Sequence, residues 1–379
     1  MAGASYALPA RFVTALLASF TLAAGAELKL PTNDQEVLER LPAAIFYSEA
    51  APPRGADPAA AVALARRHLE MARRLGDARF AGLAMGALQG WDEPRNDPIE
   101  VLVMQATIAQ HVHEFERAER LLGTAVARAP DNPQAWLTLA TVRRVRGRLA
   151  ASDTACRGLV SAGQPFYGDA CLAENRALRG DTDGALAHFE RLLARSTDQG
   201  QRAWLLASAA LAHELAGDVV AAERQYRSAV TLSQDGFTRL AYADLLLANA
   251  RPSEADAVLA DAPASDAVLL RRAIAARALG KSDAAALAAE IDQRFATASA
   301  RGNGTTHLRE RAIQLLALRD DAAGALELAE RNLAGQREPA DLLLFARAAS
   351  AAGDAAALRR LRALMNETGI RDERTASLL

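Results

Sequence analysis

Residues 133–165, PQAWLTLATVRRVRGRLAASDTACRGLVSAGQP, contain the pattern that decides the fold. Small and apolar side chains recur at the i, i+3 and i+4 spacing of one helix face, first before and then after a turn at Gly147. They are Trp136, Leu139 and Ala140 before the turn, and Ser152, Cys156 and Leu159 after it. Pro165 closes the unit, because proline disfavours a helical residue before it. The stretch therefore predicts two antiparallel helices joined by a short turn.

The turn of this unit recurs along the chain as a glycine, a polar residue, and a small residue five positions after the glycine. The pairs are Gly76 and Ala81, Gly147 and Ser152, Gly180 and Ala185, Gly217 and Ala222, and Gly280 and Ala285. Ala118, Ala255 and Ala325 take the small position where the glycine is replaced, and Gly353 opens a degenerate last copy. The small residues follow one another at about 34 residues. One hairpin cannot bury its own apolar face, so this period predicts a stack of hairpins.

The Trp-x-x-Leu-Ala pattern at 136–140 and the ending Ala-Pro-Asp-Asn at 129–132 resemble the tetratricopeptide repeat (TPR) signature, although Arg143 stands where the family usually has tyrosine. The resemblance is clearest over 99–235. A divergent first hairpin is expected at 58–98, and divergent repeats with a C-terminal cap at 236–379. It implies an all-α fold, a right-handed superhelical solenoid of about eight or nine antiparallel hairpins. Five identical glycine-to-small offsets argue against the alternative, a generic alanine-rich bundle.

The composition agrees with a helical fold. The chain holds 91 Ala and 54 Leu among 379 residues, and only 5% aromatic residues. Strands favour β-branched and aromatic side chains, so a β-sandwich or barrel is excluded. The net charge of −2 gives no basic excess for binding nucleic acid.

The first residues have the parts of a secretory signal peptide. Arg11 is followed by fifteen uncharged residues, 12–26, which end in Ala-Gly-Ala. This run is shorter than the roughly 20 residues of a membrane span. We expect residues 1–26 to be removed near Ala26, leaving a periplasmic or secreted chain without a membrane span. A retained anchor or a core helix is the alternative. Residues 27–57, with four prolines, are expected to form an arm or linker that includes a short helix at 34–41.

The two cysteines, Cys156 and Cys171, would lie in an oxidising compartment after export. A disulfide is one interpretation. The other is a pair of buried thiols that act as small apolar side chains.

No catalytic, cofactor or metal constellation stands out in the sequence. The tripeptide Gly280-Lys281-Ser282 resembles the end of a phosphate-binding loop, but Ala275 occupies the position where that motif needs glycine. His113 and Glu114 begin a zinc-protease-like pattern that fails at Arg117, where histidine is required. We therefore predict a protein that is not an enzyme and has no cofactor or metal.

The resemblance implies a binding surface, because the first helices of successive TPR hairpins line a concave face. Carried over to this chain, the candidates are Thr107, Gln110, Gln134, Thr141, Arg144, Tyr167, Glu174, Trp204, Glu214, Phe237, Asp244 and Arg277. Mixed aromatic and charged side chains suit an extended peptide or a partner helix. The alternative is a solvated groove in which Trp204 and Phe237 pack between repeats. The Lys, Arg and Asn set with which some TPR grooves hold a C-terminal carboxylate has no full match here.

The leading hypothesis is an exported TPR scaffold that mediates protein–protein interaction in the bacterial cell envelope, as an adaptor or assembly factor. One alternative is a ligand- or glycan-binding component of polysaccharide or cell-wall export that acts with a separate membrane protein. Another is a self-associating structural scaffold.

Overall fold

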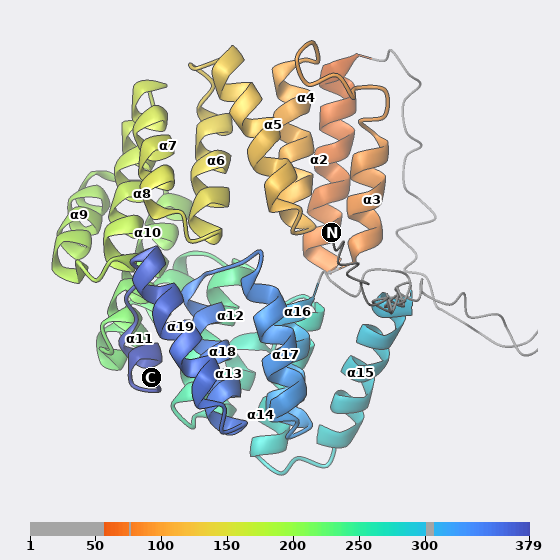
Figure 1. Ribbon diagram of the computed structural model, residues 1–379, viewed down its shortest axis with the longest axis vertical. Helices are drawn as coiled ribbons and strands as arrows, with labels where there is room; N and C mark the ends of the chain where they lie inside the picture. Colours follow the sequence, from red (N-terminus) through yellow and green to blue (C-terminus); the bar gives the residue numbers. More distant parts are fainter. Residues whose placement is uncertain (1–56, 76, 301–306) are drawn as a thin grey trace, which may run out of the picture.

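The computed structural model describes residues 57–75, 77–300 and 307–379. The expected signal peptide and nearly all of the arm lie outside these residues. Within the described ranges, 19 helices, α2 to α20, account for all regular secondary structure (Figure 1). The first 18 pair into nine antiparallel hairpins, and α20 follows the last pair. The predicted all-α solenoid of helical hairpins is confirmed.

The hairpins follow one another along the chain. They are α2 (Pro58–Leu75) with α3 (Ala78–Gly86), α4 (Ile99–His111) with α5 (Phe115–Arg128), α6 (Pro133–Val145) with α7 (Leu149–Ser161), α8 (Pro165–Leu178) with α9 (Thr182–Arg195), and α10 (Gln199–Leu215) with α11 (Val219–Leu232). They continue with α12 (Gly236–Ala248) and α13 (Pro252–Leu259), α14 (Asp266–Ala278) and α15 (Ala284–Ala300), α16 (Leu308–Leu318) and α17 (Ala322–Leu333), and α18 (Pro339–Ala351) and α19 (Ala355–Thr368), before α20 (Glu373–Ala376).

The turn inside each hairpin from α4–α5 onward contains one residue with left-handed backbone geometry. Gly147, Gly180, Gly217, Gly280 and Gly353 all have φ between 65° and 84°. In the copies without glycine, the residue five before the small position takes the same conformation: His113 at 64°, Ala250 at 55° and Asp320 at 54°. The five-residue offset therefore marks the same turn in these copies, although left-handed geometry is strained for a residue with a Cβ.

The polar residue after the turn glycine begins the second helix. Asp181, Asp218 and Asp354 each accept a hydrogen bond from a backbone N–H three residues later, at 3.1, 3.0 and 2.9 Å. Such N-caps satisfy an amide that has no partner inside the helix. Asp57 caps α2 similarly, since the amide of Ala59 donates to its carboxylate at 3.2 Å, and α2 opens the first hairpin, which was expected from residue 58.

The small residue of each unit lies where the two helices of a hairpin approach most closely. Ala118, Ser152, Ala185, Ala222 and Ala325 are fully buried, and Ala81 and Ala255 nearly so. Ala285 differs because it is exposed at the start of α15. The packing expected at Ala285 is therefore not formed, and buried Ile291 and Phe295 join α15 to α14 instead.

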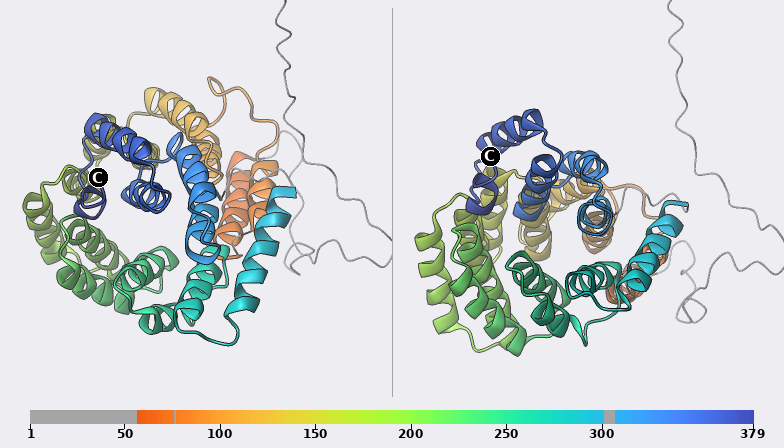
Figure 2. Two further views of the ribbon diagram at one scale, coloured as in Figure 1. Left: turned by 60° about the horizontal axis from the view of Figure 1, so that its bottom comes forward. Right: turned by 90° about the horizontal axis from the view of Figure 1, so that it is seen from below.

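The hairpins curve round so that the last helices return to hairpins in the first half of the chain (Figure 2). The amide of Arg337, before α18, donates to the carbonyl of Val145 at the end of α6 at 2.7 Å. The amide of Arg371, before α20, donates to the carbonyl of Leu178 at the end of α8 at 2.8 Å. One core cluster accordingly joins side chains of α8 to α10 with side chains of α16 to α19. We call these contacts between residues 335–379 and the turns of earlier hairpins the closing contacts.

Candidate functional site

The first helix of each hairpin lies on the inside of the curve. First helices of neighbouring hairpins contact one another, as α4 does with α6, α6 with α8, and α8 with α10. In the described part of the chain no second helix packs to that extent on the second helix of the next hairpin. The second helices therefore fan outward, and the face carried by α4, α6, α8 and α10 is concave, as the resemblance implied.

Three predicted site residues meet on this face through a shared carboxylate. Glu174 on α8 forms an ion pair with Arg144 on α6. Its other oxygen accepts hydrogen bonds from Trp204 Nε1 at 3.1 Å and from Ser208 Oγ at 2.8 Å, both on α10. Because Glu174 has partners on both sides, it ties three successive first helices together.

An aromatic pair lies next to this network. The rings of Tyr167 on α8 and Trp204 on α10 stack with centroids 5.9 Å apart, and Phe166 meets Tyr167 edge-on at 5.3 Å. Gln201 Nε2 donates to the Tyr167 hydroxyl at 3.1 Å. The residues joined by these contacts, Phe166 apart, form a group that we call the inner-face cluster. Its six members are Arg144, Tyr167, Glu174, Gln201, Trp204 and Ser208. Each of them is half-buried.

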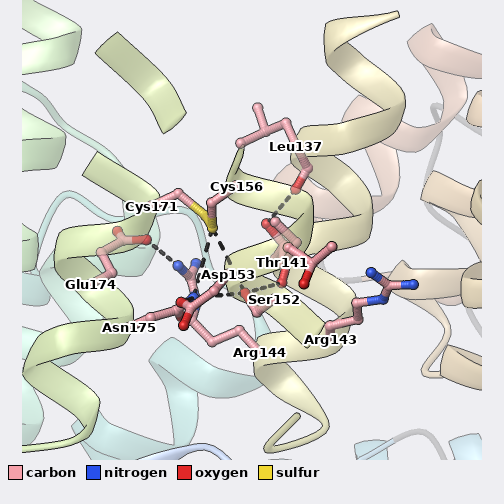
Figure 3. The surroundings of a disulfide bond; sticks show 12 residues. Leu137, Thr141, Arg143, Arg144, Ser152, Asp153, Cys156, Cys171, Glu174 and Asn175 are labelled. Carbon is pink, nitrogen blue, oxygen red and sulfur yellow. Dashed lines mark hydrogen bonds and ion pairs between the residues drawn. A yellow bond between two sulfur atoms is a disulfide. The ribbon is translucent and has the colours of Figure 1, made fainter. Parts of the chain in front are cut away.

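A disulfide lies close to Glu174 and Arg144 of the cluster (Figure 3). Cys156 on α7 and Cys171 on α8 are bonded, with Cα atoms 5.8 Å apart. Next to it the buried Asn175 donates to Ser152 Oγ at 3.0 Å and to Asp153 at 2.8 Å. The sequence left two interpretations open, a disulfide or two buried thiols. The structure contains the disulfide. It fixes α8, which carries Tyr167 and Glu174, against the preceding hairpin.

Four further candidates lie near the concave face without joining the cluster. The hydroxyls of Thr107 and Thr141 donate to carbonyls one turn back in their own helices, at 2.7 and 3.1 Å. Gln134 donates to Thr138 at 3.1 Å, and Gln110 is half-buried. The hydrogen bonds of Thr107, Gln134 and Thr141 stay within single helices and involve no residue of the cluster.

Glu214 is placed differently from the expectation that it lines a groove. It is only 8% exposed, forms an ion pair with Arg374 of α20, and accepts a hydrogen bond from the Tyr226 hydroxyl at 2.7 Å. Burial raises the pKa of Glu214 despite the neighbouring Arg374. Glu214 is therefore a closing contact, satisfied by the chain itself.

The remaining candidates lie farther along the ring. Asp244 receives two hydrogen bonds of 2.9 Å from the buried Arg271. Arg277 donates to the carbonyl of Ala317 at 2.7 Å and pairs with Asp320 at 2.6 Å. Both therefore join neighbouring first helices. Phe237 is 73% exposed, so it does not pack between repeats.

Sequence reasoning missed Ser208 and Gln201. Ser208 stands four residues after Trp204 and so shares its helix face, a spacing that could have indicated it. Gln201 stands three residues before Trp204 and follows the same rule.

The described residues contain no cluster of three or more metal-binding side chains. The tripeptide Gly280-Lys281-Ser282 forms the turn between α14 and α15, where Lys281 pairs with Asp256 at 2.7 Å. Among the helices that the structure describes, none has the length and apolar character of a membrane span.

No family model and no curated protein matches the chain. Solved structures do match. A thermophilic TPR protein of Thermus thermophilus is 22% identical and covers 54% of this chain and 98% of its own, with a TM-score of 0.39. A tetratricopeptide repeat protein of Parabacteroides merdae is 16% identical and covers 66% and 98%, with a TM-score of 0.38. PilW, a type IV pilus biogenesis factor, is 16% identical and covers 61% and 94%, with a TM-score of 0.36.

The nine hairpins of the described residues, and the turn register that eight of them keep, define the chain as an all-α helical-repeat solenoid.

Proposed function

We propose that the protein is a scaffold that binds a segment of another protein against the inner-face cluster. The observation that carries the proposal is the arrangement around Glu174, where aromatic rings, a guanidinium and an amide lie together on a concave face. Extended segments and helices dock on such faces, where aromatic side chains supply contact area and polar groups set orientation.

The cluster is preorganised for this role. Glu174 holds Arg144, Trp204 and Ser208 in place before any partner arrives. The disulfide holds α8 against α7. Side chains that are already ordered lose less conformational entropy on binding, which favours affinity.

The proposed place of action is the bacterial cell envelope. Support for it comes from the signal-like start of the sequence and from the cysteine pair, since disulfides persist in oxidising compartments. Deleting residues 1–26 should leave the protein in the cytoplasm, as fractionation would show. Export of the shortened chain would contradict this part of the proposal.

Affinity capture from the native envelope, followed by mass spectrometry, tests the binding role. The double variant Arg144→Gln with Glu174→Gln should lose the specific partner, since it removes both charges of the cluster. The matched control is Arg360→Gln with Glu330→Gln, an ion pair between exposed side chains of α19 and α17.

The control should retain the partner that the cluster variant loses. Equal retention by both variants would contradict binding at the cluster. A glycan or small molecule retained in place of a protein would support the ligand-binding alternative and contradict the scaffold role.

A further inference from the structure

A second surface lies on the outside of the ring, away from the inner-face cluster. A hollow of about 600 Å³, open to solvent, is lined by Arg95, Arg120, Gly123, Thr124, Ala127 and Arg128. Five of these residues are on α5 at positions i, i+3, i+4, i+7 and i+8, so they form one stripe of the helix surface. Arg95 faces them from the connection between α3 and α4.

The three arginines around the hollow form no ion pair with a carboxylate of the described residues. The arginines of the next hairpin, by contrast, are paired: Arg143, Arg146 and Arg148 all pair with Glu119 of α5. In the described part of the chain, neither Arg95 nor Arg120 has a carboxylate within ion-pairing distance. The hollow therefore carries three arginines that have no ion-pair partner among the described residues, although Asp97 of the connecting segment lies near enough to Arg128 to interact with it electrostatically.

Arg128 is held in position by backbone oxygens. Its Nη1 donates to the carbonyl of Pro94 at 2.8 Å and to that of Asp97 at 2.7 Å. Arg128 acts electrostatically on the side-chain carboxyl of Asp97, but its hydrogen bond to Asp97 is accepted by the backbone carbonyl. One end of the guanidinium is thus anchored to the connecting segment, and Arg128 forms no ion pair with a carboxylate of the described residues.

Gly123 forms the floor of the hollow, where α5 carries no side chain. Gly123 lies inside α5, where glycine destabilises a helix by about 1 kcal/mol relative to alanine. A Cβ atom at this position would meet nothing within 4 Å, so packing in the fold does not require glycine there. The missing side chain leaves room for another chain to approach the helix between Arg120 and Arg128.

We infer that this hollow binds an acidic segment of a partner protein, with carboxylates held by Arg95, Arg120 and Arg128. Guanidinium groups match carboxylates in a two-pronged geometry. Arg120 and Arg128 are eight residues apart, about 12 Å along the helix, so an extended segment with several carboxylates spans them better than one compact anion. A compact phosphate would favour backbone N–H groups at a helix N-terminus, and the donors here are side chains in the later turns of α5. The inference is independent of the inner-face cluster.

Fluorescence anisotropy with a labelled oligoglutamate peptide and the purified full chain tests the inference, with oligoglutamine as the uncharged probe. Arg120→Gln and Arg128→Gln should each weaken oligoglutamate binding by about fivefold, the effect of one lost ion pair. Gly123→Leu should weaken it by at least that much, because the new side chain fills the floor. Leucine favours helix more than glycine does, so Gly123→Leu should unfold at the wild-type temperature or above.

Arg191→Gln is the matched control, since Arg191 is an exposed arginine on α9, another second helix. It should bind oligoglutamate as the wild type does. Equal weakening by Arg191→Gln, unchanged binding by Gly123→Leu, or no binding of oligoglutamate by the wild type would overturn the inference. Binding of inorganic phosphate but not oligoglutamate, with the same dependence on Arg120 and Arg128, would also overturn it and assign a phosphate site.

Discussion

Glu214 and Arg374 form an ion pair across 160 residues of sequence. Glu214 is near the end of α10 and Arg374 lies in α20, so the pair joins the fifth hairpin to the last helix of the chain. Asp372, which is buried, orients Arg374 by accepting from its Nε at 2.9 Å. Together with the amides of Arg337 and Arg371, this pair closes the ring and fixes the curvature of the face that carries the inner-face cluster.

Arg374→Gln should destabilise the fold by about 3 kcal/mol, because it leaves the buried carboxylate of Glu214 without its cation. Chemical denaturation would measure the loss. Arg360→Gln removes an arginine from a pair whose side chains are about half exposed, and it should change stability by less than about 1 kcal/mol. Equal effects of the two variants would show that the closing contact contributes no more than a surface pair.

Gly147→Ala should cost more than Gly353→Ala, although both residues have left-handed backbones, with φ of 71° and 69°. The conformational cost of about 1–2 kcal/mol is common to both. Only at Gly147 would the new Cβ press on the closing segment, at 3.0 Å from Thr368 and 3.2 Å from Arg337, which should add about 1 kcal/mol. Losses of the same size, measured by thermal unfolding, would contradict the position of that segment.

Ala185→Leu should destabilise the protein by about 1–3 kcal/mol, since Ala185 is fully buried between α8 and α9 and a larger side chain overpacks the hairpin. Ala187→Leu is the control on the same helix, because Ala187 is exposed. It should leave the melting temperature almost unchanged. A tolerated Ala185→Leu would mean that the repeat register is wrong.

The chain purified from an oxidising compartment should show no titratable thiols in denaturant, because Cys156 and Cys171 are bonded. Replacing both with alanine should lower stability by about 3 kcal/mol, the value for a cross-link that closes a loop of 15 residues. Detection of two thiols per chain would contradict the disulfide.

Acidification should destabilise the protein between pH 6.5 and about 4, and His111 should account for part of the loss. Burial, together with the nearby Arg73, lowers the pKa of His111 from 6.5 to about 4. A histidine whose pKa is lowered by folding favours the folded state above pH 6.5, and that contribution disappears as the pH falls through its folded pKa. His111→Gln should therefore reduce the loss of stability over this interval.

The comparison of His111→Gln with the wild type is needed because other groups titrate in the same interval. The raised pKa of Glu214 acts in the opposite direction, since protonating this buried carboxyl favours the folded state. Its effect cancels in the difference between the two proteins. Identical pH profiles would contradict a role for His111.

The local part of the fold could be predicted from the sequence. The offset between turn and small residue located the turn at Ala250 as well as at Gly217, because backbone sterics and close helix packing repeat every 34 residues or so. The same regularity placed Arg144, Glu174 and Trp204 on one face. Ala285 does not take the buried position that the pattern predicts, because α15 packs on α14 through Ile291 and Phe295 instead.

The closing contacts could not be predicted in the same way. The pairing of Glu214 with Arg374 depends on the summed rotation of five hairpins, and small changes per repeat determine which turns meet. The sequence period does not determine this summed rotation. Glu214 was therefore predicted to line the groove. The hollow beside α5 likewise needs the position of the segment that carries Arg95, which has no repeat pattern of its own.

Site-specific photo-crosslinking in the native envelope tests the central claim most directly. A photoreactive amino acid at Thr141 or Ser208, on the concave face, should crosslink to one and the same protein. The same amino acid at Arg191 or Arg224, exposed on the outer helices α9 and α11, should give no crosslink to that protein. Crosslinks from the outer positions alone, or from no position, would contradict a scaffold that binds its partner on the inner face.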